Sequence, residues 1–119
     1  MHVEWIAVNF QNVGGPNRQP HAYVYIRDEL GMPVDGAKVT GNWSGCMKQN
    51  GAWALTNTYY NPDGTVSAAG VADVKGKKAS CWGGANSCNF IFTVTSVSKS
   101  GMSYDAFSNV ISTQGQVCW

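Results

Sequence analysis

Aromatic side chains are the residues of this sequence best suited to recognising a ligand. The chain holds five Trp and five Tyr among 119 residues, although Val, Ile and Phe alone can build the core of a small domain. Exposed aromatic rings usually mark a binding surface. Pyranose sugars present flat C–H faces that stack on such rings, which are rigid and lose little freedom on binding. The aromatic excess therefore points to carbohydrate binding.

Period-two alternation separates rings that face a core from rings that face solvent. Trp43 shares its expected face with Ala37 and Val39, which assigns it to the core. Outward-facing rings, together with two polar side chains that can reach sugar hydroxyls, form the expected binding set. Its members are Trp5, Tyr25, Trp53, Tyr60, Trp82, Arg27 and Asn57.

An aromatic-rich segment supplies part of this set. A single strand is expected over residues 52–60. Every second side chain of a strand lies on the same face, so one face carries Trp53, Leu55, Asn57 and Tyr59. A continuous strand presents these side chains together, so the segment is the expected place where specificity is added.

Catalytic constellations are missing from the sequence. Most of its seven acidic residues are expected in turns, where Asp is favoured because it caps its own backbone, and Asp35 and Asp63 lie directly beside Gly or Pro. His21 follows Pro20 at a strand start and is expected at the surface. The phosphate-binding, serine-hydrolase and zinc-protease motifs do not occur. We therefore expect a protein that is not an enzyme.

Charge and hydropathy exclude two classes of partner. Charged residues make up 13% of the chain and the formal net charge is +1, so nothing attracts nucleic acid. No apolar run approaches the ~20 residues that span a bilayer, so no membrane partner is expected. We expect no cofactor, and the single candidate is a structural calcium ion. Residues 27–29 and 61–64 offer it oxygen atoms, but fewer than the six to eight ligands that calcium takes.

The order of strand and turn signals predicts an all-β fold. Only Leu30 and Leu55 represent the commonest helix-favouring apolar residue, and no helix is expected. Turn signals recur roughly every ten residues, which is typical of an antiparallel β-sandwich. The strands are expected at residues 3–10, 20–28, 37–44, 52–60, 65–68, 71–75, 89–98 and 102–113. We expect about 7–9 strands in one domain over residues 1–119.

Several motifs resemble a known family. Residues 28–39 read D-x-x-G-x-P-V-x-G-A-x-V, and residues 41–45 read G-x-W-S-G. Together with residues 64–74 and 90–97, this pattern resembles the immunoglobulin-like domains that bacteria append to secreted hydrolases. The resemblance implies an immunoglobulin-like sandwich, tethered to a catalytic domain in the full-length protein.

Four cysteines are expected to form two disulfides. They show no C-x-x-C spacing, and the two histidines lie far from them in sequence, which disfavours a zinc site. Of the three pairings, we favour Cys81 with Cys88, and Cys46 with Cys118. Each bridge contributes about 2–4 kcal/mol and implies an oxidising compartment. The expected location is secreted and extracellular.

Two functions from different classes fit these observations. The first is a monomeric, non-catalytic carbohydrate-binding module that recognises β-linked plant polysaccharide of the β-glucan or cello-oligosaccharide type. The second is a structural or adhesive immunoglobulin-like accessory domain of a secreted protease or other exported enzyme. The aromatic excess favours the first, and the family resemblance favours the second.

Overall fold

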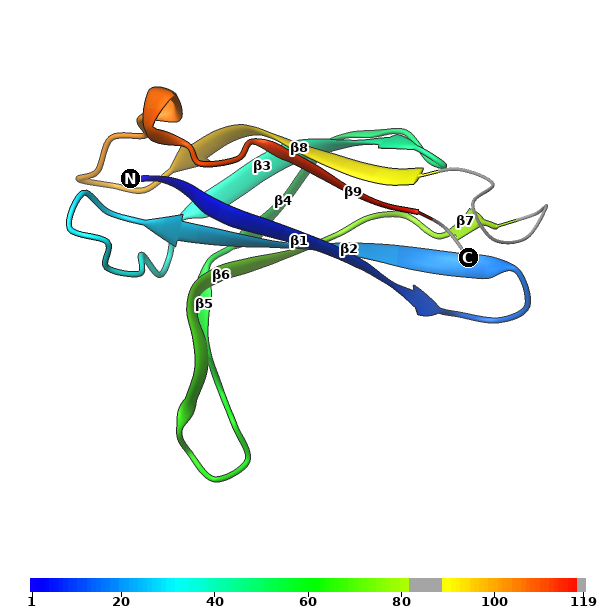
Figure 1. Cartoon of the computed structure of the whole chain (residues 1–119), viewed down its shortest axis with the longest axis horizontal. Helices are drawn as coiled ribbons and strands as arrows, with labels where there is room; N and C mark the ends of the chain where they lie inside the picture. The colour runs from blue at the N-terminus through cyan, green and yellow to red at the C-terminus, as the bar shows by residue number, and fades with distance from the viewer. Residues whose placement is uncertain (82–88, 118–119) are drawn as a thin grey trace.

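The protein is a sandwich of two antiparallel sheets (Figure 1), seen in a computed structural model that describes residues 1–81 and 89–117. The described strands are β1 (His2–Asn12), β2 (Asn17–Arg27), β3 (Lys38–Gly45), β4 (Gln49–Leu55), β5 (Asn57–Tyr60), β6 (Val66–Lys75), β7 (Ala79–Ser80), β8 (Asn89–Ser98) and β9 (Thr113–Val117), with one 3₁₀ turn, η1 (Ala106–Ser108). The predicted all-β class and strand number are confirmed.

The two sheets have the connectivity of a Greek-key sandwich. Sheet A has the order β1-β2-β6-β5, with the short β7 paired to β2, and sheet B has the order β4-β3-β8-β9. If β7 is left out and the other strands are lettered in chain order, the sheets read A-B-E-D and C′-C-F-G. This order is compatible with an immunoglobulin-like domain.

The core lies between the sheets and follows the alternation of the sequence. On β2, Ala22, Val24 and Ile26 are buried, whereas the residues between them face outward. Trp43 is buried on β3, and its ring lies 5.0 Å from that of Phe92 at an angle of 55°. The prediction that Trp43 belongs to the core is confirmed.

The last predicted strand, over residues 102–113, is wrong. This segment contains η1, and β9 begins only at Thr113. The Asp105 carboxylate accepts hydrogen bonds from Phe107 N (3.2 Å) and Ser108 Oγ (2.6 Å). Such local bonds between side chain and backbone compete with strand pairing and favour a turn.

The predicted continuous strand over residues 52–60 is also wrong. The chain leaves sheet B after Leu55 and enters sheet A at Asn57, so it crosses from one sheet to the other at Thr56. Thr56 is 3% exposed. Its Oγ1 donates to Val34 O (2.6 Å) and accepts from Ala37 N (2.9 Å). These bonds satisfy polar groups that the crossing buries.

Removing the Thr56 hydroxyl is therefore expected to destabilise the fold. The substitution Thr56→Val keeps the shape of the side chain but leaves the Ala37 N–H and the Val34 carbonyl without this partner, at a cost of about 1–3 kcal/mol. Urea denaturation measures the change. The matched control is Thr40→Val on the outer face of sheet B, expected to stay within about 0.5 kcal/mol of wild type. Equal effects of the two substitutions would contradict the account of the crossing.

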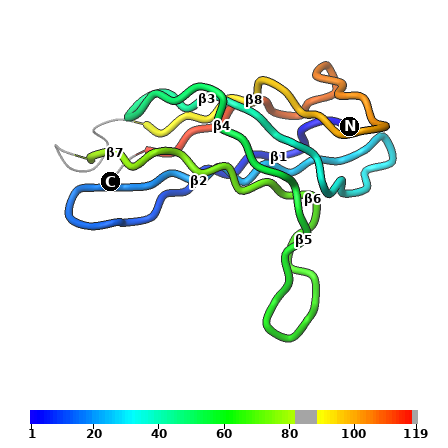
Figure 2. The backbone as a smooth tube through the Cα atoms, turned by 180° about the vertical axis from the view of Figure 1, so that it is seen from behind, coloured from blue at the N-terminus to red at the C-terminus, as the bar shows by residue number. Residues whose placement is uncertain are grey.

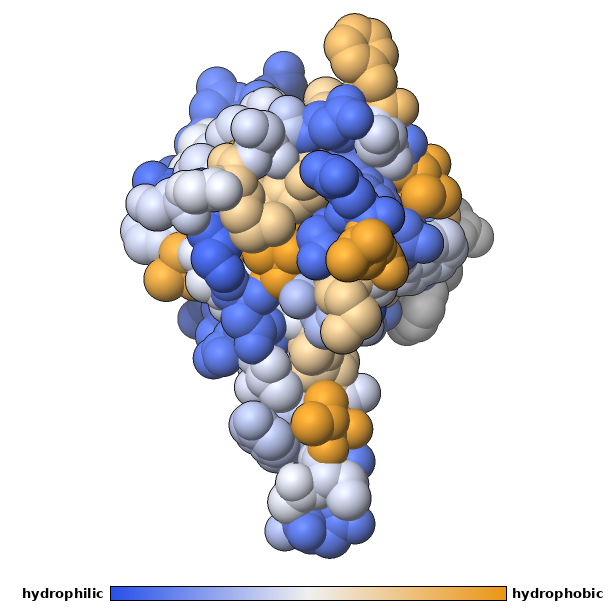
Figure 3. Space-filling model, turned by 90° about the vertical axis from the view of Figure 1, so that its left-hand side faces the viewer, coloured by the Kyte–Doolittle hydropathy of each residue, from blue (hydrophilic) through white to orange (hydrophobic). Residues whose placement is uncertain are grey.

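Strands β5 and β6 continue beyond the sandwich as a projecting hairpin, residues 57–69, which we call the finger. It leaves the body on the outer side of sheet A (Figures 1 and 2), and a side view shows it standing clear of the body (Figure 3). At its base, β6 bends at Gly70, whose φ of +65° suits glycine. The predicted strands 65–68 and 71–75 are thus one bent strand.

Two of the four cysteines lie in the described part of the chain. Neither Cys46 nor Cys81 is free, and no disulfide joins two described residues. The predicted partners Cys88 and Cys118 lie outside the described residues, so both bridges remain predictions. Within residues 1–81 and 89–117, no helix is long and apolar enough to cross a membrane.

Candidate functional site

One row of side chains crosses the outer face of sheet A. Trp5 of β1 pairs with Tyr25 of β2, Tyr25 pairs with Val71 of β6, and Val71 pairs with Asn57 of β5. Paired residues lie side by side on the same face of a sheet. Three predicted site residues, Trp5, Tyr25 and Asn57, are therefore aligned across four strands.

Two further tyrosines lie near this row. Tyr23 lies two residues before Tyr25 on β2, about 7 Å along the same face. Trp5 is 51% exposed and Tyr59 of the finger is 42% exposed, while Tyr23 and Tyr25 are half-buried. We call these four rings, Trp5, Tyr23, Tyr25 and Tyr59, the aromatic strip.

Tyr59 faces the sheet although it belongs to the finger. Burial, followed by the Asp73 carboxylate, raises the pKa of Tyr59 above the ordinary tyrosine value. Burial also raises the pKa of Tyr23, with contributions from Asp73, Tyr59 and Tyr25 in that order. Tyr59 pairs with Ala68, five residues before Asp73 on β6, so in a flat sheet it would be about 16 Å away along the strand. The bend at Gly70 brings Tyr59 back over the face.

A buried histidine supports the strip from one side. His21 is 5% exposed, so the expectation of a surface histidine is wrong. Its Nδ1 lies 2.9 Å from Asp73 Oδ1 and its Nε2 lies 3.1 Å from Gln11 Oε1. The imidazole stacks on the Tyr23 ring, with centroids 6.0 Å apart and an interplanar angle of 10°. These contacts hold Tyr23 in place on the face.

The raised tyrosine pKa values predict how stability changes in alkali. The folded state retains these phenolic protons to a higher pH than the unfolded chain does. The two tyrosines therefore make their full contribution to the free energy of unfolding below pH ~10, and this contribution is lost as the pH rises through the folded pKa values. The substitution Asp73→Asn removes one of the charges that raise them. We expect a tyrosinate absorbance titration of Asp73→Asn to begin at lower pH than that of wild type. An unchanged or later titration would show that Asp73 does not act on Tyr23 and Tyr59.

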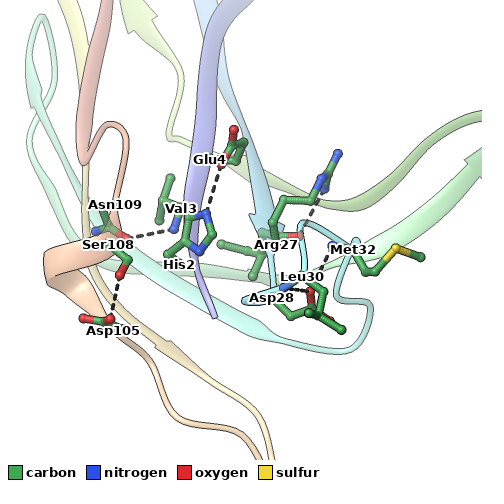
Figure 4. A network of polar contacts seen from close by, with 11 residues as sticks. His2, Val3, Glu4, Arg27, Asp28, Leu30, Met32, Asp105, Ser108 and Asn109 are labelled. Atoms are coloured by element: carbon green, nitrogen blue, oxygen red, sulfur yellow. Dashed lines mark hydrogen bonds and ion pairs between the residues drawn. The ribbon is translucent and has the colours of Figure 1, made fainter.

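Arg27 provides a cation at the edge of the strip. Its guanidinium carbon lies 5.8 Å from the centroid of the Tyr25 ring. Its Nη1 donates to Ile26 O and to Ala69 O, each at 3.1 Å, which joins β2 to the base of the finger. Figure 4 shows Arg27 near the end of β2 across from His2 and Glu4 of β1. The predicted residue Arg27 thus lies with Trp5, Tyr25 and Asn57.

The remaining predicted site residues lie elsewhere. Trp53 is 57% exposed on the outer face of sheet B, where the Lys38 ammonium lies 4.7 Å from its ring centroid. Tyr60 lies on the finger, paired with Val66. Trp82 is outside the described residues. The strand crossing at Thr56 explains why Trp53 is separated from Asn57 and Tyr59.

Three of the seven acidic side chains hold turns. Asp28 accepts from Leu30 N and Met32 N, each at 2.9 Å, and Asp105 caps η1 (Figure 4). Asp63 binds both the N–H and the hydroxyl of Thr65 at the tip of the finger. Asp73 is different, because it lies within a strand and contacts His21. The described residues contain no group of three or more His, Cys, Asp or Glu side chains that could hold a metal ion.

A shallow depression of about 600 Å³ lies away from the strip. It is lined by Asn9, Phe10, Asn12, Arg18 and Gln116. The Arg18 guanidinium binds Asn12 Oδ1 (3.2 Å) and Gly15 O (2.8 Å), and so holds the turn between β1 and β2. The Phe10 ring packs on the core, 5.9 Å from that of Phe90. Phe10 is the one aromatic residue among the five that line this depression.

Comparison with known proteins adds no relative. No protein-family model, curated protein or solved structure matches the chain. The resemblance to appended immunoglobulin-like domains therefore depends on the sequence motifs and on a compatible strand order.

Proposed function

We propose that this protein is a non-catalytic carbohydrate-binding module that holds β-linked plant polysaccharide, of the β-glucan or cello-oligosaccharide type, on the outer face of sheet A. The observation that carries the proposal is the aromatic strip. Four rings from three strands lie on one face, and two of them are more than two-fifths exposed. A soluble domain has no packing reason to leave such rings in water.

The surroundings of the strip suit a polyhydroxylated ligand. Stacked rings desolvate the C–H faces of pyranose units, and polar groups at their edges bind the hydroxyls. Arg27 and Asn57 flank the row that contains Trp5 and Tyr25, and Asp73 lies beside Tyr23. A β-linked chain is extended, which matches a strip that crosses several strands.

The roles of the acidic residues support a binding protein over a glycosidase. A retaining glycosidase needs two carboxyl groups about 5 Å apart beside the substrate. Asp28, Asp63 and Asp105 are used within their own turns, and Asp73 is paired with a buried histidine. We propose that the isolated domain binds without hydrolysis and uses no cofactor.

The wider setting belongs to the same proposal. Two disulfides, Cys81 with Cys88 and Cys46 with Cys118, staple a secreted extracellular domain. The domain acts as a monomer, tethered to a catalytic domain that it holds on the polymer.

Affinity gel electrophoresis against a panel of soluble polysaccharides tests this function. We expect β-glucan in the gel to retard the wild-type protein, whereas an α-linked glucan or a polyanion does not. Unretarded migration with every β-linked polymer would contradict carbohydrate binding.

The second candidate is a structural or adhesive immunoglobulin-like accessory domain. Its supporting observation is the strand order, which is compatible with that fold. This candidate predicts that no polysaccharide retards the protein and that loss of the Trp5 ring has no effect on any binding.

A further inference from the structure

The finger forms a wall beside the aromatic strip. It leaves the sandwich on the side toward which the outer face of sheet A points (Figures 1 and 2). From Asn57 to Tyr60 the ribbon extends about 10 Å, in three steps of about 3.3 Å, before the tip adds its own length. The molecule measures 45 × 37 × 20 Å, and the finger points along the 37 Å direction (Figure 1).

The wall is firmly anchored at its base. Asp35 holds both of its strands, because its carboxylate accepts from Gly70 N (2.8 Å) and from the Thr58 hydroxyl. The Lys99 ammonium donates to Asp35 O (2.6 Å). A Cβ atom on Gly70 would lie 2.8 Å from Ile26 O and from Val34 N, so the bend itself is tightly packed. These contacts hold the base of the finger against the sandwich.

The corner between wall and face is lined by side chains of the strip. Val71 lies in the same outward row as Tyr25 and Asn57, yet it is 2% exposed and does not belong to the core cluster. Its cover must therefore come from the outer side. Tyr59, on the finger, lies close enough to Tyr23 to raise the pKa of that phenol, and Asp73 lies close enough to raise the pKa of both tyrosines. Tyr23 and Tyr59 therefore lie near each other where the wall meets the face, and Trp5 lies at the far edge of the sheet, on β1.

This geometry restricts the form of ligand that can reach the rings. The row that contains Trp5 and Tyr25 ends at Asn57, the first residue of the finger. A flat, rigid surface laid over sheet A would meet the tip of the finger first, about 10 Å or more above the row. Stacking needs carbon atoms within about 4 Å of one another. A separate chain can lie in the corner, but a crystal face cannot.

From this corner we infer that the finger selects single, separated glycan chains and excludes the flat faces of crystalline polysaccharide. The inference rests on the proposed function and deepens it. Soluble β-glucan and amorphous cellulose are ligands, and microcrystalline cellulose is not. The finger excludes flat crystal faces, and the rings stack on the separate chains that reach them.

A trimmed finger tests the inference. Replacing residues 59–68 with Asn-Gly joins Thr58 to Ala69 by a two-residue hairpin turn and keeps the bonds of Asp35 to Thr58 and Gly70. Wild type is expected to bind soluble β-glucan and to stay in the supernatant with microcrystalline cellulose. The trimmed protein is expected to adsorb to microcrystalline cellulose at least several-fold more strongly than wild type.

A second, smaller deletion tests the same inference if the first variant does not fold. Replacing residues 61–65 with Asn-Gly joins the paired residues Tyr60 and Val66, keeps Tyr59 and shortens only the tip. It is expected to gain crystalline adsorption to an intermediate degree. The matched control, Tyr59→Ala, removes a ring and leaves the wall, so it should gain none.

The outcomes separate the inference from the proposed function. Adsorption of wild type to microcrystalline cellulose as strong as its binding to soluble β-glucan would overturn the inference and leave carbohydrate binding intact. If a folded trimmed variant did not adsorb more strongly than wild type to microcrystalline cellulose, the inference would also be overturned and carbohydrate binding would again remain intact. Absence of wild-type binding to every form of glucan would overturn the proposed function and the inference together.

Discussion

Replacing Trp43 with alanine is expected to lower the free energy of unfolding by about 3–5 kcal/mol. Among the residues that the structure describes, Trp43 is the largest fully buried side chain, and it packs on Phe92 between the two sheets. Gly76 lies against it, since a Cβ atom there would be 3.1 Å from Trp43 Cε2. Alanine leaves a cavity that rigid sheets fill only partly. Chemical denaturation measures the loss, which is large because the whole free energy of unfolding of a typical domain is about 5–15 kcal/mol.

Trp43→Phe is the matched control for this prediction. The indole Nε1 is buried and finds no hydrogen-bond partner among the residues that the structure describes. Phenylalanine keeps a ring against Phe92 and removes that N–H group. We expect Trp43→Phe to recover most of the stability that Trp43→Ala loses. Near-wild-type stability of Trp43→Ala would show that this ring does not anchor the core.

Replacing Trp5 or Tyr25 with alanine is expected to weaken binding of soluble β-glucan by about 5- to 150-fold. A ring that anchors a ligand contributes about 1–3 kcal/mol, and each 1.4 kcal/mol is a factor of ten. Both side chains face away from the core, so thermal unfolding of Trp5→Ala should stay close to that of wild type. Isothermal titration calorimetry with a β-linked oligosaccharide measures the affinities.

Trp53→Ala is the control for the binding prediction. Trp53 is as exposed as Trp5 but lies on the outer face of sheet B, beneath the Lys38 ammonium. The Trp53→Ala protein should bind β-glucan with the affinity of the wild type. A loss of affinity in Trp53→Ala, with none in Trp5→Ala, would move the site to sheet B and contradict the proposed face.

Alternation was enough to predict most strands and the inward place of Trp43. The bounds of β8 match the strand expected over residues 89–98, because burial on one face imposes a period of two. The outward place of Trp5, Tyr25 and Arg27 follows for the same reason.

The crossing at Thr56 could not be read from alternation. Residues 52–60 keep one alternating pattern, and the chain changes sheets because a threonine hydroxyl can satisfy backbone groups 19 and 22 residues away in sequence. Such bonds depend on the tertiary fold. As a result, Trp53 was grouped with Asn57 and Tyr59, from which the structure separates it.

His21 and Asp73 were missed for a related reason. Each looks like an ordinary polar strand residue, and only the pairing of β2 with β6 brings their side chains within 2.9 Å. Tyr23 was within reach of sequence reasoning, since it shares its face with Tyr25. Tyr59 was not, because its position over the strip depends on the bend at Gly70.

The indole N–H signals in a nuclear magnetic resonance titration test the central claim most directly. Each tryptophan gives its own signal, so Trp5 on sheet A, Trp43 in the core and Trp53 on sheet B report on three places in one experiment. On addition of a soluble β-linked oligosaccharide, the account predicts a saturable shift of the Trp5 signal, with those of Trp43 and Trp53 nearly unmoved. A shift of Trp53 without Trp5, or no shift at saturating sugar, would contradict binding on the outer face of sheet A.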